Sequence, residues 1–182
     1  MEDKNRTYNN SLLLAVNNST KLFGKPIGVD IAKFLSSNEL LEVGIIAKMF
    51  LSNIPDDGLI GRKCHIVNDN FIRNYNDISK GYPIKMYMTI GNVYFKNEIQ
   101  YEEQTVDTLK SIIKKGPSAE PLDTHVWLTL EDGCVLDLTL LNSGGVDRKT
   151  PLFLWSPTVE SDYYFQPLLF DNGFANKVDT LF

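Results

Sequence analysis

Three residues that lie far apart in the sequence, Cys64, His125 and Asp137, have the side-chain types that nucleophilic catalysis at a carbonyl carbon requires. A cysteine attacks as its thiolate, and a histidine can take the proton of the thiol and later give it to a leaving group. An aspartate bonded to the other ring nitrogen holds the imidazole in the required tautomer. These roles are those of a catalytic triad with sulfur in place of oxygen, so we treat the three as candidate catalytic residues.

Residues 125–139 have the pattern of a β-hairpin that carries both the base and the acid. Both arms are rich in Val, Leu, Trp and Thr, and the Glu-Asp-Gly sequence at 131–133 is typical of a turn. A three-residue loop places Asp137 on the same face as His125, one diagonal step away and within reach of it. A two-residue turn would shift the register by one and place Asp137 on the opposite face. The triad hypothesis therefore requires a loop of odd length.

Cys64 precedes a segment that suits a helix, because no Gly or Pro interrupts the apolar pattern before Gly81. Gly58 and Gly61 bracket a flexible approach to it. In the first helical turn, unpaired N–H groups and the helix dipole lower the pKa of a thiol. The backbone N–H of Cys64 is suited to bind an oxyanion, and the sequence leaves open whether a second donor is Asn53, Asn68 or Trp127.

Other residues of these types have other expected roles. His65 is adjacent to Cys64 and points about 100° away from it on a helix, so it is poorly placed to be the base. Cys134 falls on the face opposite Asp137 and is assigned to the core, and both cysteines are expected to be free thiols. Asp123 is a rival of Asp137 for the imidazole, but it precedes the strand and lacks a fixed face.

Three short segments carry a resemblance to a known family: Gly61-Arg62-Lys63-Cys64 before a helix, His125-Val126-Trp127, and Asp137-Leu138-Thr139. Their order and local sequence resemble the transglutaminase-like branch of the papain-like cysteine enzymes, including small bacterial and phage members. The resemblance covers residues 58–140 and implies a nucleophile helix packed on an antiparallel sheet. His65 departs from the family pattern, in which an aromatic residue frequently follows the cysteine, and no upstream Gln or Trp supplies a second oxyanion donor.

Composition limits the function classes. The chain has 182 residues and a formal net charge of −5, without a dense run of Lys or Arg, so we do not expect a nucleic-acid partner. The apolar run at residues 12–16 is too short to span a membrane and lacks a cleavage signal, so we expect a cytoplasmic protein without a membrane partner. With two histidines and no C-x-x-C pair, we expect no metal ion and no cofactor.

Periodicity and turn residues predict the elements that position the candidate residues. Residues 1–10 are expected to be frayed, and a first helix is expected at 12–24. A capping box at Ser36 and Glu39 predicts a mostly buried helix at 40–51. The other predicted elements are a helix at 31–35 capped by Asp30, a half-buried strand at 82–90 that turns at 91–92 into 93–95, and a helix at 106–115. A strand is predicted at 152–155 and a strand or a loop at 163–170, both confined by proline to the edges or ends of a sheet.

Together these patterns predict a single α+β domain over residues 1–182, with a papain-like core, N-terminal helices and the nucleophile helix packed on an antiparallel sheet. The expected activity is that of a thiol-dependent hydrolase or acyl transferase that acts on an amide of a protein or peptide, either in the backbone or in a glutamine side chain. The alternative is an interaction protein with the same scaffold and no catalysis. The sequence does not define the oligomeric state.

Overall fold

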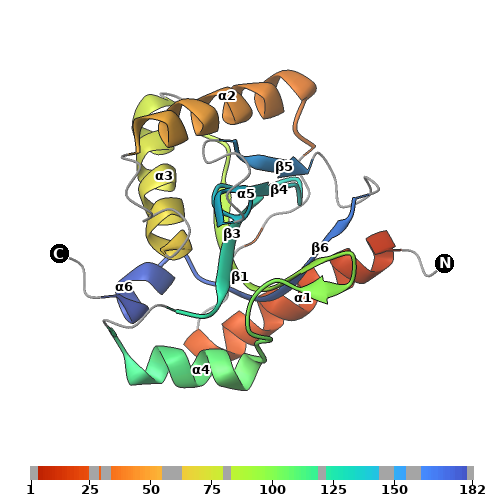
Figure 1. Cartoon of the computed structure of the whole chain (residues 1–182), viewed down its shortest axis with the longest axis vertical. Coiled ribbons are helices and arrows are strands. Elements are labelled where there is room, and N and C mark those ends of the chain that lie inside the picture. The colour runs from red at the N-terminus through yellow and green to blue at the C-terminus, as the bar shows by residue number, and fades with distance from the viewer. Residues whose placement is uncertain are drawn as a thin grey trace.

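A computed structural model gives the structure of residues 4–24, 29, 34–54, 63–79, 83–118, 122–143, 150–154 and 161–179. This part of the chain is an α+β fold in which helices cover an open antiparallel sheet (Figure 1). Its helices are α1 (Lys4–Phe23), α2 (Ser37–Asn53), α3 (Cys64–Ile78), α4 (Val106–Lys115), α5 (Leu140–Ser143) and α6 (Phe174–Val178). Its strands are β1 (Met86–Phe95), β2 (Glu98–Ile99), β3 (His125–Leu130), β4 (Val135–Asp137), β5 (Leu152–Leu154) and β6 (Tyr163–Phe170).

β1 is the central strand of the sheet. β3 pairs with β1 from Met86 to Gly91, and β6 pairs with β1 from Thr89 to Phe95. Because Thr89, Ile90 and Gly91 pair with both strands, β3 and β6 lie on opposite edges of β1. β4 and β5 continue the sheet beyond β3, and β2 forms a short hairpin with the end of β1. All of these pairings are antiparallel.

The hairpin of β3 and β4 has the register that the triad hypothesis requires. Leu128 lies opposite Leu136, and the N–H of Leu130 donates to the carbonyl oxygen of Cys134 over 2.8 Å. Three residues form the loop, which ends at Gly133 with a φ of 85°, a conformation that glycine adopts without strain. The prediction of an odd loop is confirmed, and the acid on β4 therefore shares a face with the base on β3.

Helices cover both faces of the sheet (Figure 1). α1 packs on one face, where Tyr8 and Leu12 join a hydrophobic cluster that includes Trp127. α2 and most of α3 cover part of the other face through a second cluster around Phe71. The start of α3 meets α4 and α6 in a third cluster that contains Cys64. α6 consequently lies beside the end of α3 that carries the candidate nucleophile.

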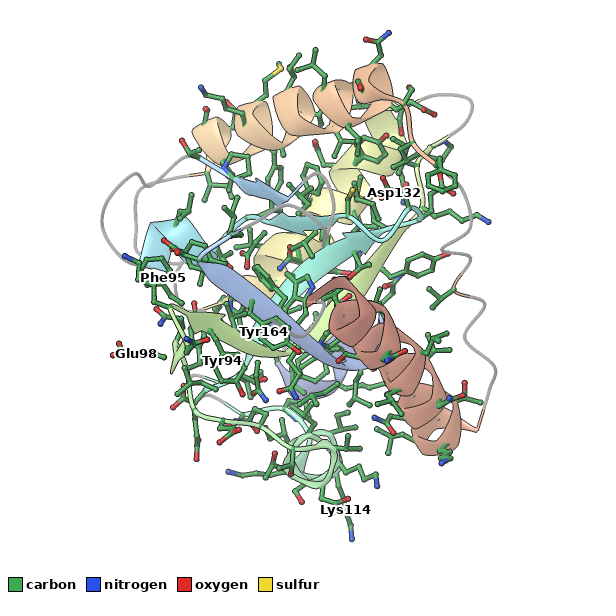
Figure 2. All side chains as sticks on the ribbon, turned by 90° about the vertical axis from the view of Figure 1, so that its right-hand side faces the viewer. Tyr94, Phe95, Glu98, Lys114, Asp132 and Tyr164 are labelled. Carbon is green, nitrogen blue, oxygen red and sulfur yellow. The ribbon has the colours of Figure 1, made fainter. Side chains whose placement is uncertain are left out.

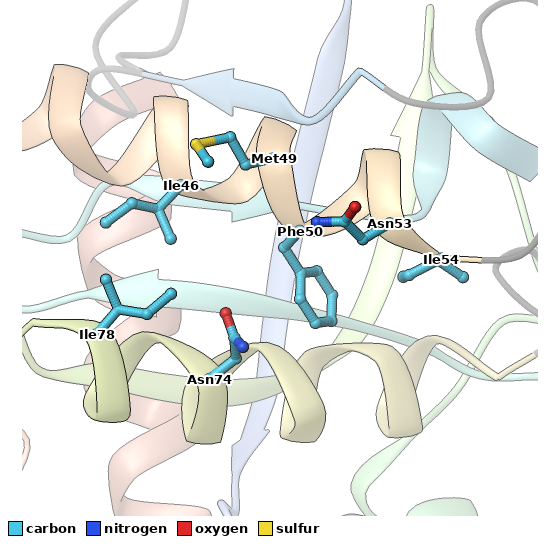
Figure 3. A pocket seen from close by; sticks show the side chains of 7 residues that line it. All are labelled: Ile46, Met49, Phe50, Asn53, Ile54, Asn74 and Ile78. Atoms are coloured by element: carbon cyan, nitrogen blue, oxygen red, sulfur yellow. The ribbon is translucent and has the colours of Figure 1, made fainter.

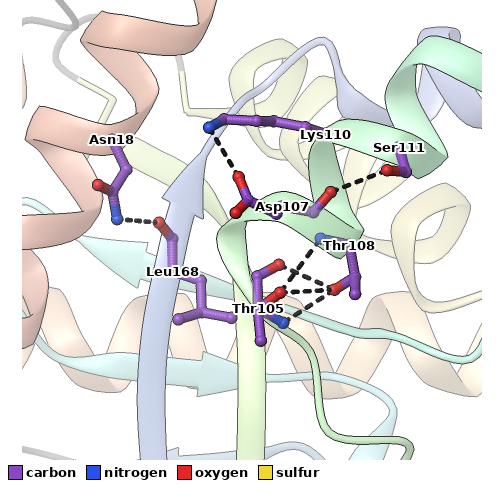
Figure 4. Close-up of polar contacts among 7 residues, drawn as sticks. All are labelled: Asn18, Thr105, Asp107, Thr108, Lys110, Ser111 and Leu168. Carbon is purple, nitrogen blue, oxygen red and sulfur yellow. Dashed lines mark hydrogen bonds and ion pairs between the residues drawn. The ribbon is translucent and has the colours of Figure 1, made fainter.

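α1 is longer than predicted because it begins at Lys4. The expectation that residues 1–10 are frayed is wrong from that residue onward, since Tyr8 is buried against the sheet. A side-chain hydrogen bond also ties the helix to the edge strand β6: Nδ2 of Asn18 donates to the carbonyl oxygen of Leu168 over 3.2 Å (Figure 4). The burial of Tyr8 accounts for the extension of the helix before residue 12, which the local sequence does not predict.

α2 begins as predicted, because the side chains of Ser36 and Glu39 form both hydrogen bonds of a capping box. The expectation that this helix is mostly buried is wrong. One stripe of the helix is buried: Leu40, Val43, Ala47 and Leu51. Apolar side chains on its other side are exposed: Leu41, Ile45 and Met49. The helix lies at the edge of the fold over α3, so only one of its sides meets the core (Figure 1).

β1 is continuous where a turn was predicted at residues 91–92, so that prediction is wrong. A Cβ on Gly91 would lie 2.1 Å from the carbonyl oxygen of Gln166 and 3.0 Å from the ring of Trp127. The glycine therefore permits the close approach of β6 and the indole. The chain turns instead at Lys96 and Asn97, whose φ values of 50° and 69° suit a type I′ turn. Helices cover both faces of β1, which is buried rather than half-buried.

The later elements largely follow their predictions. α4 occupies the predicted range, with Thr105 and Thr108 forming its capping box (Figure 4) and Gly116 following it at a φ of 78°. β5 lies within its predicted range, and β6 matches its own as an edge strand that contains Pro167. The one-turn helix α5 begins three residues after β4 ends.

Two predictions fall wholly or partly outside the described residues. Gly58 and Gly61 lie outside them, as does most of the helix predicted at 31–35, of which the described residues Phe34 and Leu35 are not helical. Within the described ranges, no helix combines the length and the apolar character needed to cross a bilayer.

We expect Gly91→Ala to lower the free energy of unfolding by about 1–3 kcal/mol, because the new methyl group would overlap the backbone of β6. Gly44→Ala is the matched control, since this glycine lies in α2 with nothing within 4 Å of a Cβ. Alanine should stabilise that helix by about 0.5–1 kcal/mol. Urea unfolding followed by circular dichroism measures both changes. A Gly91→Ala protein as stable as the parent would contradict the close approach of β6 to β1.

Candidate active site

Cys64 is the first residue of α3, as predicted. The amides of Ile66 and Val67 donate to the carbonyl oxygen of Lys63, so the N–H of Cys64 precedes them at the open end of the helix. The sulfur lies 3.6 Å from the carbonyl oxygen of Thr124, the residue before β3. Cys64 is 8% exposed, so the thiol is largely buried at the point where the helix meets the sheet.

His125 and Asp137 form a short hydrogen bond inside the fold. Nε2 of His125 donates to Oδ2 of Asp137 over 2.5 Å, and both side chains are buried. The other carboxylate oxygen, Oδ1, accepts from the N–H and the hydroxyl of Thr139 and from the N–H of Leu140. Both oxygens are thus satisfied, and the carboxylate is held in one orientation beneath the imidazole.

The imidazole of His125 also interacts with the thiol of Cys64. Nε2 is occupied by Asp137, and Nδ1 is buried without a hydrogen-bond partner among the described residues. Nδ1 is therefore the ring nitrogen available to the sulfur. The structure brings all three predicted residues together, in the order sulfur, imidazole and carboxylate that proton transfer requires.

The electrostatics of the site favour an ion pair between the thiol and the imidazole. Burial acts to raise the pKa of Cys64, but hydrogen bonds and charge from His125 and His65 together outweigh it and lower the pKa to about 6. Burial acts to lower the pKa of His125, but Asp137 and then Cys64 outweigh it and raise the pKa to about 10. At neutral pH the two groups are thus a thiolate and an imidazolium, which titrate as a coupled pair.

His65 also lies close enough to the thiol for the two groups to shift each other's pKa. Its pKa is raised because hydrogen bonding and charge from Cys64, followed by those from Asp179, outweigh the effect of burial. Nε2 of His65 lies 3.1 Å from Oδ2 of Asp179, at the end of α6. Lys63 lies 3.4 Å from the same carboxylate oxygen. The thiol therefore has two histidine neighbours, each with a carboxylate partner.

Tyr101 is a residue of the site that the sequence did not suggest. Its ring stacks on that of His125, with centroids 4.6 Å apart and planes inclined by 13°. The segment after it is fixed by Gln104, whose backbone exchanges hydrogen bonds with Asn92 and whose side chain donates to the carbonyl oxygen of Asp123. Because Tyr101 lies in a polar segment without periodicity, no sequence pattern marks it.

Asn68 links the nucleophile helix to the strand of the base. Its Nδ2 donates to the carbonyl oxygens of Cys64 over 2.8 Å and of Val126 over 2.9 Å. Both N–H groups of the amide are thus used inside the protein. Asn68 fixes the distance between α3 and β3, and it has no donor left for an oxyanion.

The two other suggested oxyanion donors lie in other parts of the fold. Trp127 packs beneath α1 in the cluster that contains Tyr8, whereas Cys64 belongs to another cluster, and the indole N–H is buried without a hydrogen-bond partner among the described residues. Asn53 lines a cavity of about 360 Å³ between α2 and the far end of α3 (Figure 3). Thr124 offers a different donor, because its hydroxyl is buried without a partner among the described residues and its carbonyl oxygen contacts the sulfur of Cys64.

Three acidic or thiol side chains near the hairpin are excluded from the site. Cys134 is buried in the core as predicted, and its thiol lies 3.1 Å from a carboxylate oxygen of Asp132 at the hairpin tip (Figure 2). Burial and this carboxylate raise the pKa of Cys134, which keeps the thiol protonated. Asp123 accepts from the N–H of Glu102 and does not bind the imidazole. Both cysteines are free thiols, as expected.

The described residues contain no further chemical centre of this kind. No group of three or more His, Cys, Asp or Glu side chains suited to a metal ion occurs among them. A cavity of about 370 Å³ lies between Phe23, Tyr87 and Lys177. Neither this cavity nor the one in Figure 3 is lined by Cys64 or His125.

Comparison of the chain with known proteins finds no match to a family model, to a curated protein or to a solved structure. The function of the protein therefore has to be inferred from the geometry and electrostatics of the site.

Proposed function

We propose that the protein is a thiol-dependent hydrolase or acyl transferase that acts on an amide, in a peptide or a glutamine side chain. The observation that carries this proposal is the 2.5 Å hydrogen bond between His125 and Asp137 beside a thiol at the N-terminus of a helix. The thiol has its pKa lowered to about 6, so the nucleophile is ionised before substrate binds. Asp137 binds Nε2 of the imidazole and leaves Nδ1 free for the thiol.

The reaction follows from these positions. The thiolate of Cys64 attacks the carbonyl carbon, and the N–H of Cys64 stabilises the oxyanion that forms. The carbon–nitrogen bond then breaks, its electron pair stays on nitrogen, and the amine leaves with a proton from Nδ1 of His125. Water or a second amine attacks the thioester, the carbon–sulfur bond breaks, and the electron pair returns to sulfur. Hydrolysis, deamidation and acyl transfer share the first half of this sequence.

We further propose that the fold is a papain-like core of the transglutaminase-like type. The support is the order and placement of the elements, because α3 carries Cys64 and packs on an antiparallel sheet whose strands β3 and β4 carry His125 and Asp137. The motifs Gly61-Cys64, His125-Trp127 and Asp137-Thr139 support the same assignment from the sequence.

An interaction protein that keeps this scaffold without catalysis is the second candidate. Two observations favour it: Cys64 is only 8% exposed, and two of the side chains suggested as a second oxyanion donor are placed elsewhere, since Asn68 donates to two carbonyl oxygens and Asn53 lines the cavity between α2 and α3. The two candidates differ in the reactivity that they require of Cys64.

We expect iodoacetamide to alkylate Cys64 with a midpoint near pH 6 and a plateau below about pH 8, because the thiol has its pKa lowered to about 6. His125→Ala removes the strongest stabilising partner of the thiolate and should move the midpoint upward by about one pH unit or more. Mass spectrometry of the Cys64 peptide across pH measures both midpoints.

Cys134→Ala is the matched control for this measurement, because the second thiol is buried with its pKa raised. Its removal should leave the pH profile unchanged. A midpoint of an ordinary thiol in the parent protein, with no response to His125→Ala, would support the interaction protein instead.

We expect p-nitrophenyl acetate to transfer its acetyl group to Cys64 and to release p-nitrophenol, since this ester tests thioester formation without requiring the natural substrate. Asp137→Asn keeps the size of the side chain but removes the negative charge that orients the imidazole and stabilises its protonated form. Acylation should therefore slow by about 10²-fold or more. Absorbance of p-nitrophenol and the mass of the Cys64 peptide follow the reaction. Acetylation that is equally fast in Cys64→Ala protein would exclude Cys64 as the nucleophile.

A further inference from the structure

A second histidine and carboxylate pair, His65 and Asp179, lies near the thiol. Nε2 of His65 is 3.1 Å from Oδ2 of Asp179, and the imidazole is buried between α3 and α6, where it meets the ring of Phe174 at a centroid distance of 6.4 Å. Its other nitrogen, Nδ1, is buried without a nitrogen or oxygen partner among the described residues. His65 thus presents Nδ1 and anchors Nε2, as His125 does.

The two pairs differ in how firmly the carboxylate holds its histidine. Asp137 is fully buried, lies 2.5 Å from its imidazole and accepts three further hydrogen bonds from Thr139 and Leu140. Asp179 lies 3.1 Å from its imidazole and is shared with Lys63, whose side chain is 36% exposed. The charge of Asp179 is therefore partly neutralised by a lysine that reaches solvent. Asp179 consequently supports a proton on His65 less strongly than Asp137 supports one on His125.

Acylation of the sulfur has opposite consequences for the two imidazoles. The thioester carries no charge, so both histidines lose the thiolate as a partner. For His125 the carboxylate of Asp137 raises the pKa more than the thiol does, whereas for His65 the thiol raises the pKa more than Asp179 does. Formation of the thioester thus removes the main support for a proton on His65 and leaves that of His125 in place.

We propose that His65, held by Asp179, is the general base that activates the water or amine attacking the Cys64 thioester, whereas His125 is the acid that protonates the first leaving group. The inference rests on the proposed function, which requires the thioester. It assigns the two halves of the reaction to two different histidines, both at one sulfur.

The proton balance of the second half closes with these two residues and solvent. Once the thioester has formed, His65 releases its proton to solvent, and its Nδ1 then takes a proton from the attacking water as the oxygen of that water bonds to the carbonyl carbon. The carbon–sulfur bond then breaks, its electron pair stays on sulfur, and the carboxylic acid leaves. The result is a thiolate beside a protonated His65, while His125 has regained from solvent the proton that it gave to the amine. This is the arrangement from which the next cycle begins.

Pre-steady-state kinetics with p-nitrophenyl acetate separate the two halves on the full-length protein. The initial burst of p-nitrophenol reports acylation of Cys64, and the later linear phase reports resolution of the thioester. We expect His65→Ala to keep the burst rate within about tenfold of the parent, because His125 still supports the thiolate. The linear phase should slow by about 10²-fold or more, the usual contribution of a general base. His125→Ala should slow the burst itself.

Two additions distinguish a base from a structural residue. Hydroxylamine attacks a thioester without help from a base, so it should restore turnover of the acetylated His65→Ala protein to the rate of the parent with hydroxylamine. Asp179→Asn should slow the linear phase in the same direction by about tenfold. Asp171→Asn is the matched control, since Asp171 binds Lys177 and the start of α6 but not His65, and it should leave both phases unchanged.

The outcomes for the two proposals can be told apart. A parent protein that shows no burst and no acetyl group on Cys64 overturns the proposed function and this inference with it. A parent that turns over, with a linear phase unaffected by His65→Ala and Asp179→Asn, overturns this inference alone. A folded His65→Ala protein that is slow even with hydroxylamine also overturns it, because the defect then lies in the site and not in the missing base.

Discussion

The hydrogen bond between His125 and Asp137 is the interaction on which the candidate site depends, and a three-residue loop makes it possible. Side chains alternate along both arms of the hairpin, so one residue fewer in the loop would turn Asp137 to the opposite face of the sheet. Asn68 then sets the position of α3 by bonding the carbonyl oxygens of Cys64 and Val126. A turn and a single buried amide thus bring three distant residues together.

Local pattern is sufficient for the features of the site that are encoded over a few residues. The Glu-Asp-Gly turn allows the odd register, the uninterrupted segment after Cys64 starts a helix there, and Ser36 caps α2. Each of these features is decided by neighbours within one turn or one hairpin, where propensity and capping dominate. The sequence consequently places the sulfur, the imidazole and the carboxylate on the correct elements.

Long-range packing decides the features that the sequence does not predict. Gly91 looks like a turn residue, but it serves the approach of β6 from more than 70 residues away. Tyr101 and Asp179 reach the site from segments with no distinctive pattern. The 100° spacing of successive helical residues argued against a role for His65 beside Cys64. In the first turn of a helix, however, side chains lean toward the N-terminus and no preceding turn obstructs them. Two successive residues can therefore approach the same group there.

The burial of charge at this site favours catalysis over a purely structural role. Three acidic groups meet three basic groups here. Asp137 pairs with His125, Asp179 pairs with His65 and Lys63, and the Cys64 thiolate is stabilised by both histidines. Most of these groups are removed from water. Transfer of such ions from water costs several kcal/mol each, and apolar residues of similar size often stabilise a core better. A scaffold that served only to bind a partner would gain nothing from holding a thiolate between two imidazoles. A nucleophile that must be ionised before its substrate arrives requires that arrangement.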